Sequence, residues 1–265
     1  MKNRMPAVFV GHGGPLLALE DNGITRGMAA AAEDVVARHG RPRAILAISA
    51  HWYTRGSFVQ GAPKPRQVCD MYGFPRELHK LSYPVSGDAA LTAAVRDALG
   101  DDVRVSDDWG IDHGAWSVLV HMFPQADIPV VQLSVDGTAE HRRAYEIGRL
   151  LAPLRDEGCL ILASGNVVHN LQRVDWEHPD AASTATLAFN DRIVRAVETR
   201  DDETVIGFER LPGAAYAAPT PDHFLPLLYT LGAGEGGPAH VFNNVGVLGS
   251  LSMTGFVFEG DAGRA

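Results

Sequence analysis

Leu160-Ile161-Leu162-Ala163 leads directly into Ser164-Gly165-Asn166-Val167-Val168-His169-Asn170. A short, uninterrupted apolar segment that ends in glycine and polar residues is typical of a β-strand covered on both faces. Ala7–Val10, Ala44–Ser49 and Val130–Ser134 have the same character. The sequence therefore predicts a sheet that is built around these buried strands.

Helix-like segments lie between the predicted strands. They are Arg26–His39, Asp88–Leu99, Ala139–Glu157 and Ala181–Glu198. A glycine follows each of the first three and marks the end of the predicted helix. Pro153 lies inside the third segment and is expected to bend it. The alternation of strands and helices predicts an α/β fold with a central, mostly parallel sheet flanked by helices.

The C-terminal part of the chain has a different pattern. Val241–Asn244 and Ser252–Glu259 resemble strands separated by glycines, and they predict an antiparallel C-terminal edge of the sheet. Trp52–Pro84 is rich in proline and has little periodicity, so we expect a functional loop or a small excursion over the site. No internal boundary is evident, and residues 1–265 are expected to form a single domain.

The composition excludes several classes of protein. The chain has 265 residues and is 46% hydrophobic, which suits a folded core. Its longest apolar runs, such as Ala44–Ile48, are far shorter than the roughly 20 residues of a membrane-spanning helix. The 23 Lys and Arg residues against 32 Asp and Glu residues give a net charge of −9, which argues against nucleic acid or an anionic membrane as a partner. Cys69 and Cys159 form no CxxC motif or disulfide framework, and we recognise no secretory signal, so we expect a cytoplasmic protein.

Three of the eleven histidines stand where a predicted strand ends. His12 follows Ala7–Val10 in a glycine-rich turn, His51 follows Ala44–Ser49, and His169 follows the strand at Leu160–Ala163. Ligands of open α/β sheets bind beyond the carboxyl ends of the strands, so these imidazoles are expected to share one edge of the sheet. The sequence predicts a metal site or an acid–base site there, although no short metal-binding motif is present.

Two more histidines are candidates for the same site. His113 lies in a predicted turn, Trp109-Gly110-Ile111-Asp112-His113-Gly114-Ala115-Trp116, and His223 lies in Pro219-Thr220-Pro221-Asp222-His223-Phe224-Leu225-Pro226, where a short helix is expected to open. We expect the other six histidines to be surface residues or hydrogen-bonded core residues. Asp107, Asp108 and Asp112 could form an acid–base pair of carboxylates, but a solvated turn is the simpler interpretation.

Other catalytic patterns are incomplete. The Gly11–Gly14 turn lacks the Lys-Ser/Thr of a P-loop and the third glycine of a dinucleotide-binding motif. Ser49 and Ser164 lie at strand ends, but the chain has no GxSxG nucleophile motif. Cys159 begins a strand and is expected to be a small buried hydrophobic residue.

Six segments together resemble a known family. They are Gly11-His12-Gly13-Gly14-Pro15, Ser49-Ala50-His51-Trp52, Tyr72-Gly73-Phe74-Pro75, Trp109-Gly110-Ile111-Asp112-His113-Gly114, Ala163-Ser164-Gly165-Asn166-Val167-Val168-His169-Asn170-Leu171 and Pro219-Thr220-Pro221-Asp222-His223. In this order, from about Met5 to Phe258, they resemble the class III (LigB-type) extradiol ring-opening dioxygenases, and most closely the 4,5-DOPA dioxygenase group. The resemblance implies a single LigB-like catalytic domain over residues 1–265.

The resemblance also implies a role for each histidine. His12, His51 and His223 match the metal ligands, His169 matches either a fourth ligand or the acid–base group, and His113 matches a residue near bound O₂ or substrate. One divalent metal is implied, Fe(II) for activity or Zn(II) as bound; a site of three histidines departs from the 2-His-1-carboxylate set of non-haem iron enzymes. Asp222 could orient His223, serve as an oxygen ligand or cap the following helix.

The implied substrates are a small aromatic diol, such as a DOPA-like catechol, and O₂. Trp52, Tyr72, Phe74, Trp109 and Trp116 could line an aromatic pocket, although packing is their more common role. Arg76 or Lys80 could bind a substrate carboxylate. Two alternatives stay open: a zinc-dependent hydrolase that uses the same histidines, and a non-catalytic Memo-like protein. The sequence also leaves open whether the protein forms a homo-oligomer.

Overall fold

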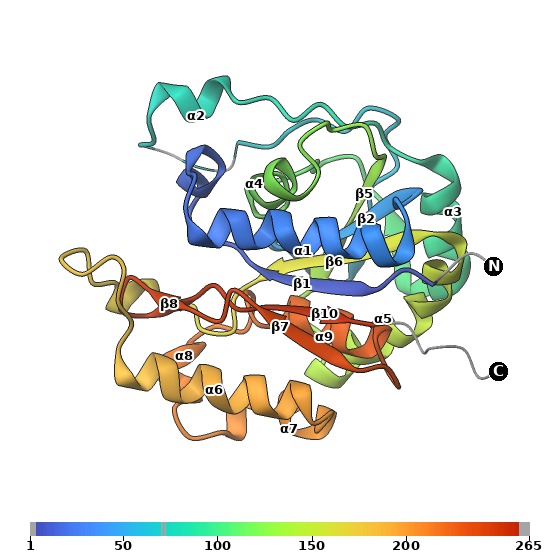
Figure 1. Ribbon diagram of the computed structural model, residues 1–265. Coiled ribbons are helices and arrows are strands. Elements are labelled where there is room, and N and C mark those ends of the chain that lie inside the picture. Colours follow the sequence, from blue (N-terminus) through green and yellow to red (C-terminus); the bar gives the residue numbers. More distant parts are fainter. Residues whose placement is uncertain (1–3, 70, 72, 260–265) are drawn as a thin grey trace.

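An eight-stranded sheet runs through the computed structural model, which describes residues 4–69, 71 and 73–259 (Figure 1). The strands lie side by side in the order β4-β3-β5-β2-β6-β1-β10-β7. In chain order they are β1 (Ala7–Gly11), β2 (Ala44–Thr54), β3 (Ser57–Val59), β4 (Val103–Val105), β5 (Val130–Asp136), β6 (Cys159–Gly165), β7 (Ala239–Phe242) and β10 (Gly255–Phe258). A separate two-stranded sheet joins β8 (Gly246–Val247) and β9 (Leu251–Ser252).

The strand directions confirm the predicted fold class. The central strands β5, β2, β6 and β1 are parallel to their neighbours in this group. At the C-terminal edge, β10 is antiparallel to both β1 and β7. At the other edge, β3 is antiparallel to β5 and parallel to β4; these two short strands were not predicted from the sequence.

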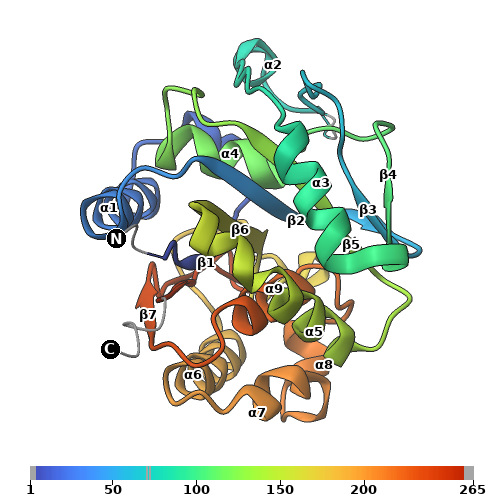
Figure 2. The same cartoon turned by 90° about the vertical axis from the view of Figure 1, so that its right-hand side faces the viewer.

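Helices cover both faces of the sheet (Figure 2). The helices of two or more turns are α1 (Gly23–His39), α3 (Ala89–Leu99), α4 (His113–Met122), α5 (His141–Leu151), α6 (Thr184–Glu198) and α9 (Leu225–Ala233). Shorter helices are α2 (Arg76–Lys80), α7 (Asp202–Ile206) and α8 (Ala214–Ala217), and the 3-10 segments are η1 (Pro15–Leu19), η2 (Gly100–Asp102), η3 (Ala152–Glu157), η4 (Leu171–Arg173) and η5 (Phe208–Arg210). None of the helices in the described part of the chain is long and apolar enough to cross a membrane.

Residues of the central strands alternate between two hydrophobic cores, because successive side chains of a strand point to opposite faces. On β6, Leu160 and Leu162 pack with α1 and α4, whereas Ile161 and Ala163 pack with α5, α6 and α9. Both faces are therefore covered, which is why β6 is apolar from Cys159 to Ala163.

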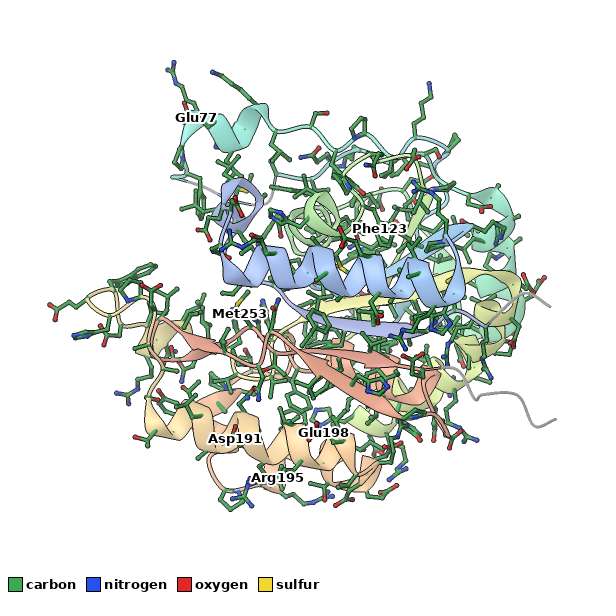
Figure 3. The ribbon with its side chains drawn as sticks, viewed as in Figure 1. Glu77, Phe123, Asp191, Arg195, Glu198 and Met253 are labelled. Atoms are coloured by element: carbon green, nitrogen blue, oxygen red, sulfur yellow. The ribbon has the colours of Figure 1, made fainter. Side chains whose placement is uncertain are left out.

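The outer helices are amphipathic. Along α6, Asp191, Arg195 and Glu198 are exposed and their side chains are labelled in Figure 3, whereas Ile193 and Val197 are buried. This alternation has the helical period of 3.6 residues, which turns one stripe of the helix toward the sheet.

Helix boundaries follow local chemistry. Asn22 caps α1 through a reciprocal capping box with Thr25, and the carboxylate of Asp88 caps α3 by accepting from the N–H of Leu91. The helix predicted for Ala139–Glu157 is α-helical only to Leu151 and continues as 3-10 helix η3, because Pro153 cannot donate a backbone hydrogen bond.

Two expectations about the site segments were wrong. His113 does not lie in a turn: it is the first residue of α4, with Asp112 at the N-cap. His51 does not follow its strand, because β2 continues to Thr54 with a register irregularity between Ile48 and Tyr53. The predicted excursion at Trp52–Pro84 also contains the end of β2, all of β3 and the short helix α2.

Candidate metal centre

Three of the predicted histidines meet beyond the carboxyl end of the parallel strands. His12 follows β1, His51 lies near the end of β2, and His223 precedes α9. Each offers a ligand atom within 4.8 Å of those of the other two, and among the described residues no other group of His, Cys, Asp or Glu meets this criterion. We call these three residues the histidine triad.

The histidine triad has the dimensions of a metal site. The ring centroids of His12, His51 and His223 lie 5.1, 5.2 and 5.3 Å apart, so they form a nearly regular triangle. The Nε2 atoms of His12 and His51 face each other at 3.1 Å. Two imidazole nitrogens bound to one Zn²⁺ at about 2.0–2.1 Å are separated by roughly 3–3.5 Å, so the observed spacing suits a shared divalent cation.

The backbone of Met253 packs closely against the end of β1, directly before His12. Met253, which is labelled in Figure 3, lies against the turn that carries His12. A Cβ atom on Gly11 would lie 2.5 Å from the carbonyl carbon of Met253, so only glycine fits at this position.

A hydrogen-bonded chain determines the tautomer of His12. The hydroxyl of Ser164 donates to the carbonyl oxygen of Gly114, because a carbonyl can only accept. Its lone pair then accepts from Nδ1–H of His12 at 2.8 Å. Nε2 of His12 consequently carries the lone pair that faces His51, which is the form a metal ligand needs.

Asp222 determines the tautomer of His223. The carboxylate accepts from Nδ1–H of His223 at 2.5 Å, which leaves Nε2 unprotonated. A carboxylate that binds the outer nitrogen of a ligand histidine orients the ring and raises its basicity. Burial raises the pKa of Asp222, but the hydrogen bond from His223 outweighs burial and lowers that pKa well below its ordinary value, so the carboxylate stays ionised.

The imidazoles of His12 and His223 are held neutral. Burial, reinforced by the neighbouring His51 and His223, lowers the pKa of His12 well below 6.5. Burial also lowers the pKa of His223, although the bond to Asp222 opposes the shift. Neutral imidazole is the form that binds cations, so burial prepares both rings for a ligand role.

His169 lies beside the triad and not within its group of ligand atoms. Its ring stacks on that of His223, with centroids 3.5 Å apart and planes at 3°. Its backbone N–H donates to the carbonyl oxygen of Ala217 at 2.8 Å. Burial and the adjacent His223 lower the pKa of His169 to about 3, so this ring is also neutral.

His113 approaches the triad from the start of α4. Its ring centroid lies 3.9 Å from that of His51 and 6.1 Å from that of His12, and the residue is buried. All five histidines singled out in the sequence therefore converge on one region.

Asp112 was misjudged from the sequence, since the expected solvated turn holds only for Asp107 and Asp108, which are exposed. Asp112 is fully buried. Its carboxylate accepts from Ser49 Oγ at 2.6 Å and Trp109 Nε1 at 2.9 Å, and it also accepts from Gln132. The available signal was its place directly before an apolar helical segment, since aspartate is a preferred N-cap residue.

The proposed pocket residues are divided among several environments. Trp52 and Trp116 are buried, and Trp116 donates from Nε1 to the carbonyl oxygen of Val68 at 2.9 Å. Arg76 and Lys80 are exposed on α2. Phe74 and Trp109 are half-buried, and Tyr72 lies outside the described residues. Cys159 is buried, as predicted.

Comparisons with known proteins agree with this geometry. Residues 6–256 match the family described as "Catalytic LigB subunit of aromatic ring-opening dioxygenase". The 4,5-DOPA dioxygenase extradiol of Escherichia coli (strain K12) is 40% identical over 256 residues, covering 94% of this chain and 93% of the relative. The protein of the same name from Beta vulgaris is 33% identical over 94% of this chain and 95% of its own length.

A solved structure has the same fold. The crystal structure of an uncharacterized protein from Escherichia coli K12 superimposes with a TM-score of 0.82 at 37% identity, covering 96% of this chain and all of that one, 100%. The resemblance noted in the six sequence segments is thus confirmed. The chain belongs to the LigB family of extradiol, aromatic ring-opening dioxygenases.

Proposed function

We propose that the protein opens the ring of a catechol-type, DOPA-like substrate with O₂ at a divalent metal held by His12, His51 and His223. The observation that carries this proposal is the spacing of the triad, in which His12 Nε2 and His51 Nε2 face each other at 3.1 Å. Two relatives named 4,5-DOPA dioxygenase extradiol match nearly the whole chain, and they support the choice of substrate class.

The donor set fits a borderline divalent cation. Three neutral imidazoles suit Zn(II) and Fe(II), and we propose Fe(II) for activity or Zn(II) as bound. When bound, the cation would lower the pKa of the catechol hydroxyls, and only a redox-active metal would also exchange electrons with O₂. Burial would keep His12 and His223 neutral, and Ser164 and Asp222 would orient them.

His169 is proposed as the acid–base residue. It stacks on His223 at 3.5 Å, outside the group of ligand atoms, and its ring is therefore next to a proposed ligand without being one of the three. From there an imidazole can take up a catechol proton and later return one to the opened product. The fourth-ligand role is less well supported, because its nitrogens lie outside the triad's 4.8 Å group.

His113 is proposed to hydrogen-bond to substrate or to oxygen. Its ring packs against that of His51, with centroids 3.9 Å apart, at the start of α4. A preorganised donor at this position stabilises negative charge that develops on the reacting oxygens. Outside the site, a cytoplasmic location without nucleic-acid or membrane partners remains part of the proposal.

Oxygen consumption tests the proposal. The protein is loaded anaerobically with Fe(II), mixed with a panel of catechols, and followed with an oxygen electrode and by visible absorbance. We expect oxygen uptake together with a yellow ring-opened product. Absence of uptake with every diol would overturn the proposal. Hydrolytic turnover under argon by the zinc-loaded protein would identify the hydrolase alternative, and failure to bind any metal would favour a non-catalytic Memo-like protein.

A further inference from the structure

We propose that Ser164 and Asn166 are positioning residues that hold His12 ready for the metal before the metal binds. The inference rests on the proposed function, in that His12 is taken as a ligand. It concerns the end of β6, which carries none of the three triad residues. Ser164 and Asn166 are both 1% exposed, so neither can contact bulk solvent.

The position of β6 in the sheet explains why its end can serve this purpose. β6 lies between β2, which carries His51, and β1, which leads into His12. Ser164 is level with Ser49 on one side and with Val10 on the other. The chain that leaves β6 is consequently flanked by two ligand-bearing segments.

Ser164 holds the ring of His12. Its hydroxyl donates to the carbonyl oxygen of Gly114, so the hydroxyl oxygen is left to accept from Nδ1–H of His12 at 2.8 Å. Gly114 belongs to α4, and the bond therefore links the ring to a rigid helix. Without the hydroxyl, this hydrogen bond would no longer keep the proton on Nδ1 or resist rotation of the ring.

Asn166 holds the main chain of His12 and connects it to His223. The side-chain amide donates from Nδ2 to the carbonyl oxygen of His12 at 2.6 Å and to that of Ser252 at 2.9 Å. The backbone N–H of Asn166 donates to the carbonyl oxygen of His223 at 2.8 Å. One residue thus touches the backbone of two triad members that are far apart in sequence.

Gly165 completes this contact. Its carbonyl oxygen accepts from the backbone N–H of His12 at 3.0 Å. A Cβ atom on Gly165 would lie 2.2 Å from the carbonyl oxygen of His223, so the two segments approach more closely than any side chain would allow. His12 and His223 are therefore both in contact with the segment Ser164-Gly165-Asn166 at the end of β6.

Substitution of Ser164 tests the ring contact. Ser164→Ala removes only the hydroxyl, and zinc affinity is measured by competition with a chromophoric chelator. Loss of an outer-shell partner typically weakens metal binding by about 10–100-fold, and we expect a change in this range. The matched control is Ser134→Ala, since Ser134 is also fully buried and bonds Thr54 and Phe58 but no histidine. We expect the control to bind zinc as the wild type does.

A metal-free measurement separates positioning from general loss of structure. Nitrogen-15 NMR of labelled histidine reports which ring nitrogen carries the proton. We expect the Nδ1–H form of His12 in the wild type and in Ser134→Ala, and loss of that form in Ser164→Ala. Unchanged zinc affinity together with an unchanged tautomer in Ser164→Ala would overturn the role of Ser164.

Asn166→Asp provides the second variant. It keeps the shape of the side chain but replaces the Nδ2 donor by an oxygen that faces two carbonyls. Its control is Asn190→Asp, because Asn190 is also buried and its amide bonds Asn244 and Thr254, away from the triad. We expect weaker zinc binding only in Asn166→Asp, and equal binding in the two variants would overturn the role of Asn166.

These measurements need no diol substrate, so the two proposals can fail separately. A wild type that opens no diol, but whose tautomer and zinc affinity depend on Ser164, would refute the proposed function and support the positioning role. A wild type that opens a diol, with neither property dependent on Ser164 or Asn166, would refute the positioning role alone.

Discussion

Two groups of histidines lie at opposite ends of the sheet, and their surroundings differ. The histidine triad stands beyond the end of β1, whose first residue, Ala7, pairs with Phe258. Glu259 follows Phe258 and binds His39 and His240 at the other end of the sheet. We refer to His39, His240 and Glu259 as the Glu259 cluster.

The difference is the placement of the carboxylate. In the Glu259 cluster, Nε2 of His39 lies 2.9 Å from a carboxylate oxygen of Glu259, which also binds Arg38. In the triad, imidazole nitrogens face one another, and the carboxylate of Asp222 binds the outer nitrogen of His223. Nε2 of His39 has a carboxylate as its neighbour, whereas ring nitrogens of the triad have one another as neighbours and lie close enough to share a cation. The number of histidines in a cluster is therefore less informative than the direction of their nitrogens.

The largest expected effect comes from removing a triad member. His223→Ala should weaken zinc binding by more than the roughly 100-fold upper figure for an outer-shell partner, because a direct ligand is lost. Oxygen uptake with catechols should become undetectable. His240→Ala, in the Glu259 cluster, is the control and should retain both properties. Zinc titration compares the affinities of the two variants, and equal affinities would contradict the ligand role of His223.

The next effect concerns turnover without loss of metal. Removal of a general acid–base residue typically lowers the rate by about 10²–10⁴-fold, and we expect His169→Ala to lower kcat in this range. Zinc affinity should be unchanged, because His169 lies outside the triad's ligand group. Oxygen-electrode kinetics and zinc titration are both required, with the exposed His178→Ala as the control. Full turnover would eliminate the acid–base role, whereas loss of metal would make His169 a ligand.

The stability of the metal-free protein should depend on pH. Burial lowers the pKa of His12 and His223, and that of His169 to about 3, so the unfolded chain binds more protons than the folded chain below pH about 6.5. The stabilising effect of a neutral ring is complete above the unfolded pKa and is lost as the pH falls toward the folded pKa. The slope is about 1.4 kcal/mol per pH unit for each such imidazole.

Urea unfolding of the metal-free protein between about pH 5 and about pH 7 measures this slope. His169→Ala should reduce it by roughly the share of one imidazole, about 1.4 kcal/mol per pH unit. His178→Ala should leave it unchanged. Equal slopes in His169→Ala and the wild type would contradict the neutral, buried state of His169.

The smallest effect is expected at the Glu259 cluster. Glu259→Gln removes a buried charge that accepts a hydrogen bond from Arg38 and lies beside His39, and loss of such a charge-assisted hydrogen bond costs about 1–3 kcal/mol. The free energy of unfolding should fall by this amount at neutral pH, while zinc affinity stays at the wild-type value. A change in zinc affinity would mean that the two ends of the sheet are coupled.

The pattern of apolar segments predicted much of the fold. Each of the four strands recognised in the sequence lies in the sheet, and the antiparallel edge is present. The short strands β3 and β4 were missed because three residues are too few to show a period. His113 was placed in a turn because the N-cap role of Asp112 was not recognised, and a turn and a helix start share the same residue types.

The five histidines that the sequence offered as candidates lie together in the structure, and their roles stay predictions. The residues that support them were not predicted. His12 and His51 were found because strands end near them. His223 was a candidate from its proline-rich segment, and its role as a ligand came from the resemblance. Ser164 and Asn166 gave no comparable signal as partners of His12, because their bonds to it span 152 and 154 residues. The partners of Asp112 on β2 and β5, Ser49 and Gln132, were not predictable either, although its place before an apolar helical segment was an available signal.

The sequence by itself determined the layered α/β architecture, since strand and helix periods, caps and breaks depend on neighbouring residues. It also indicated which imidazoles would reach the carboxyl edge of the sheet. The partner that orients His223 is also local, since Asp222 is its neighbour in the chain. Only the tertiary structure decided which nitrogen of His12 faces the other rings, because that direction depends on Ser164, which lies 152 residues away on β6. Hydrogen bonding between elements sets this ring direction, and no local pattern encodes it.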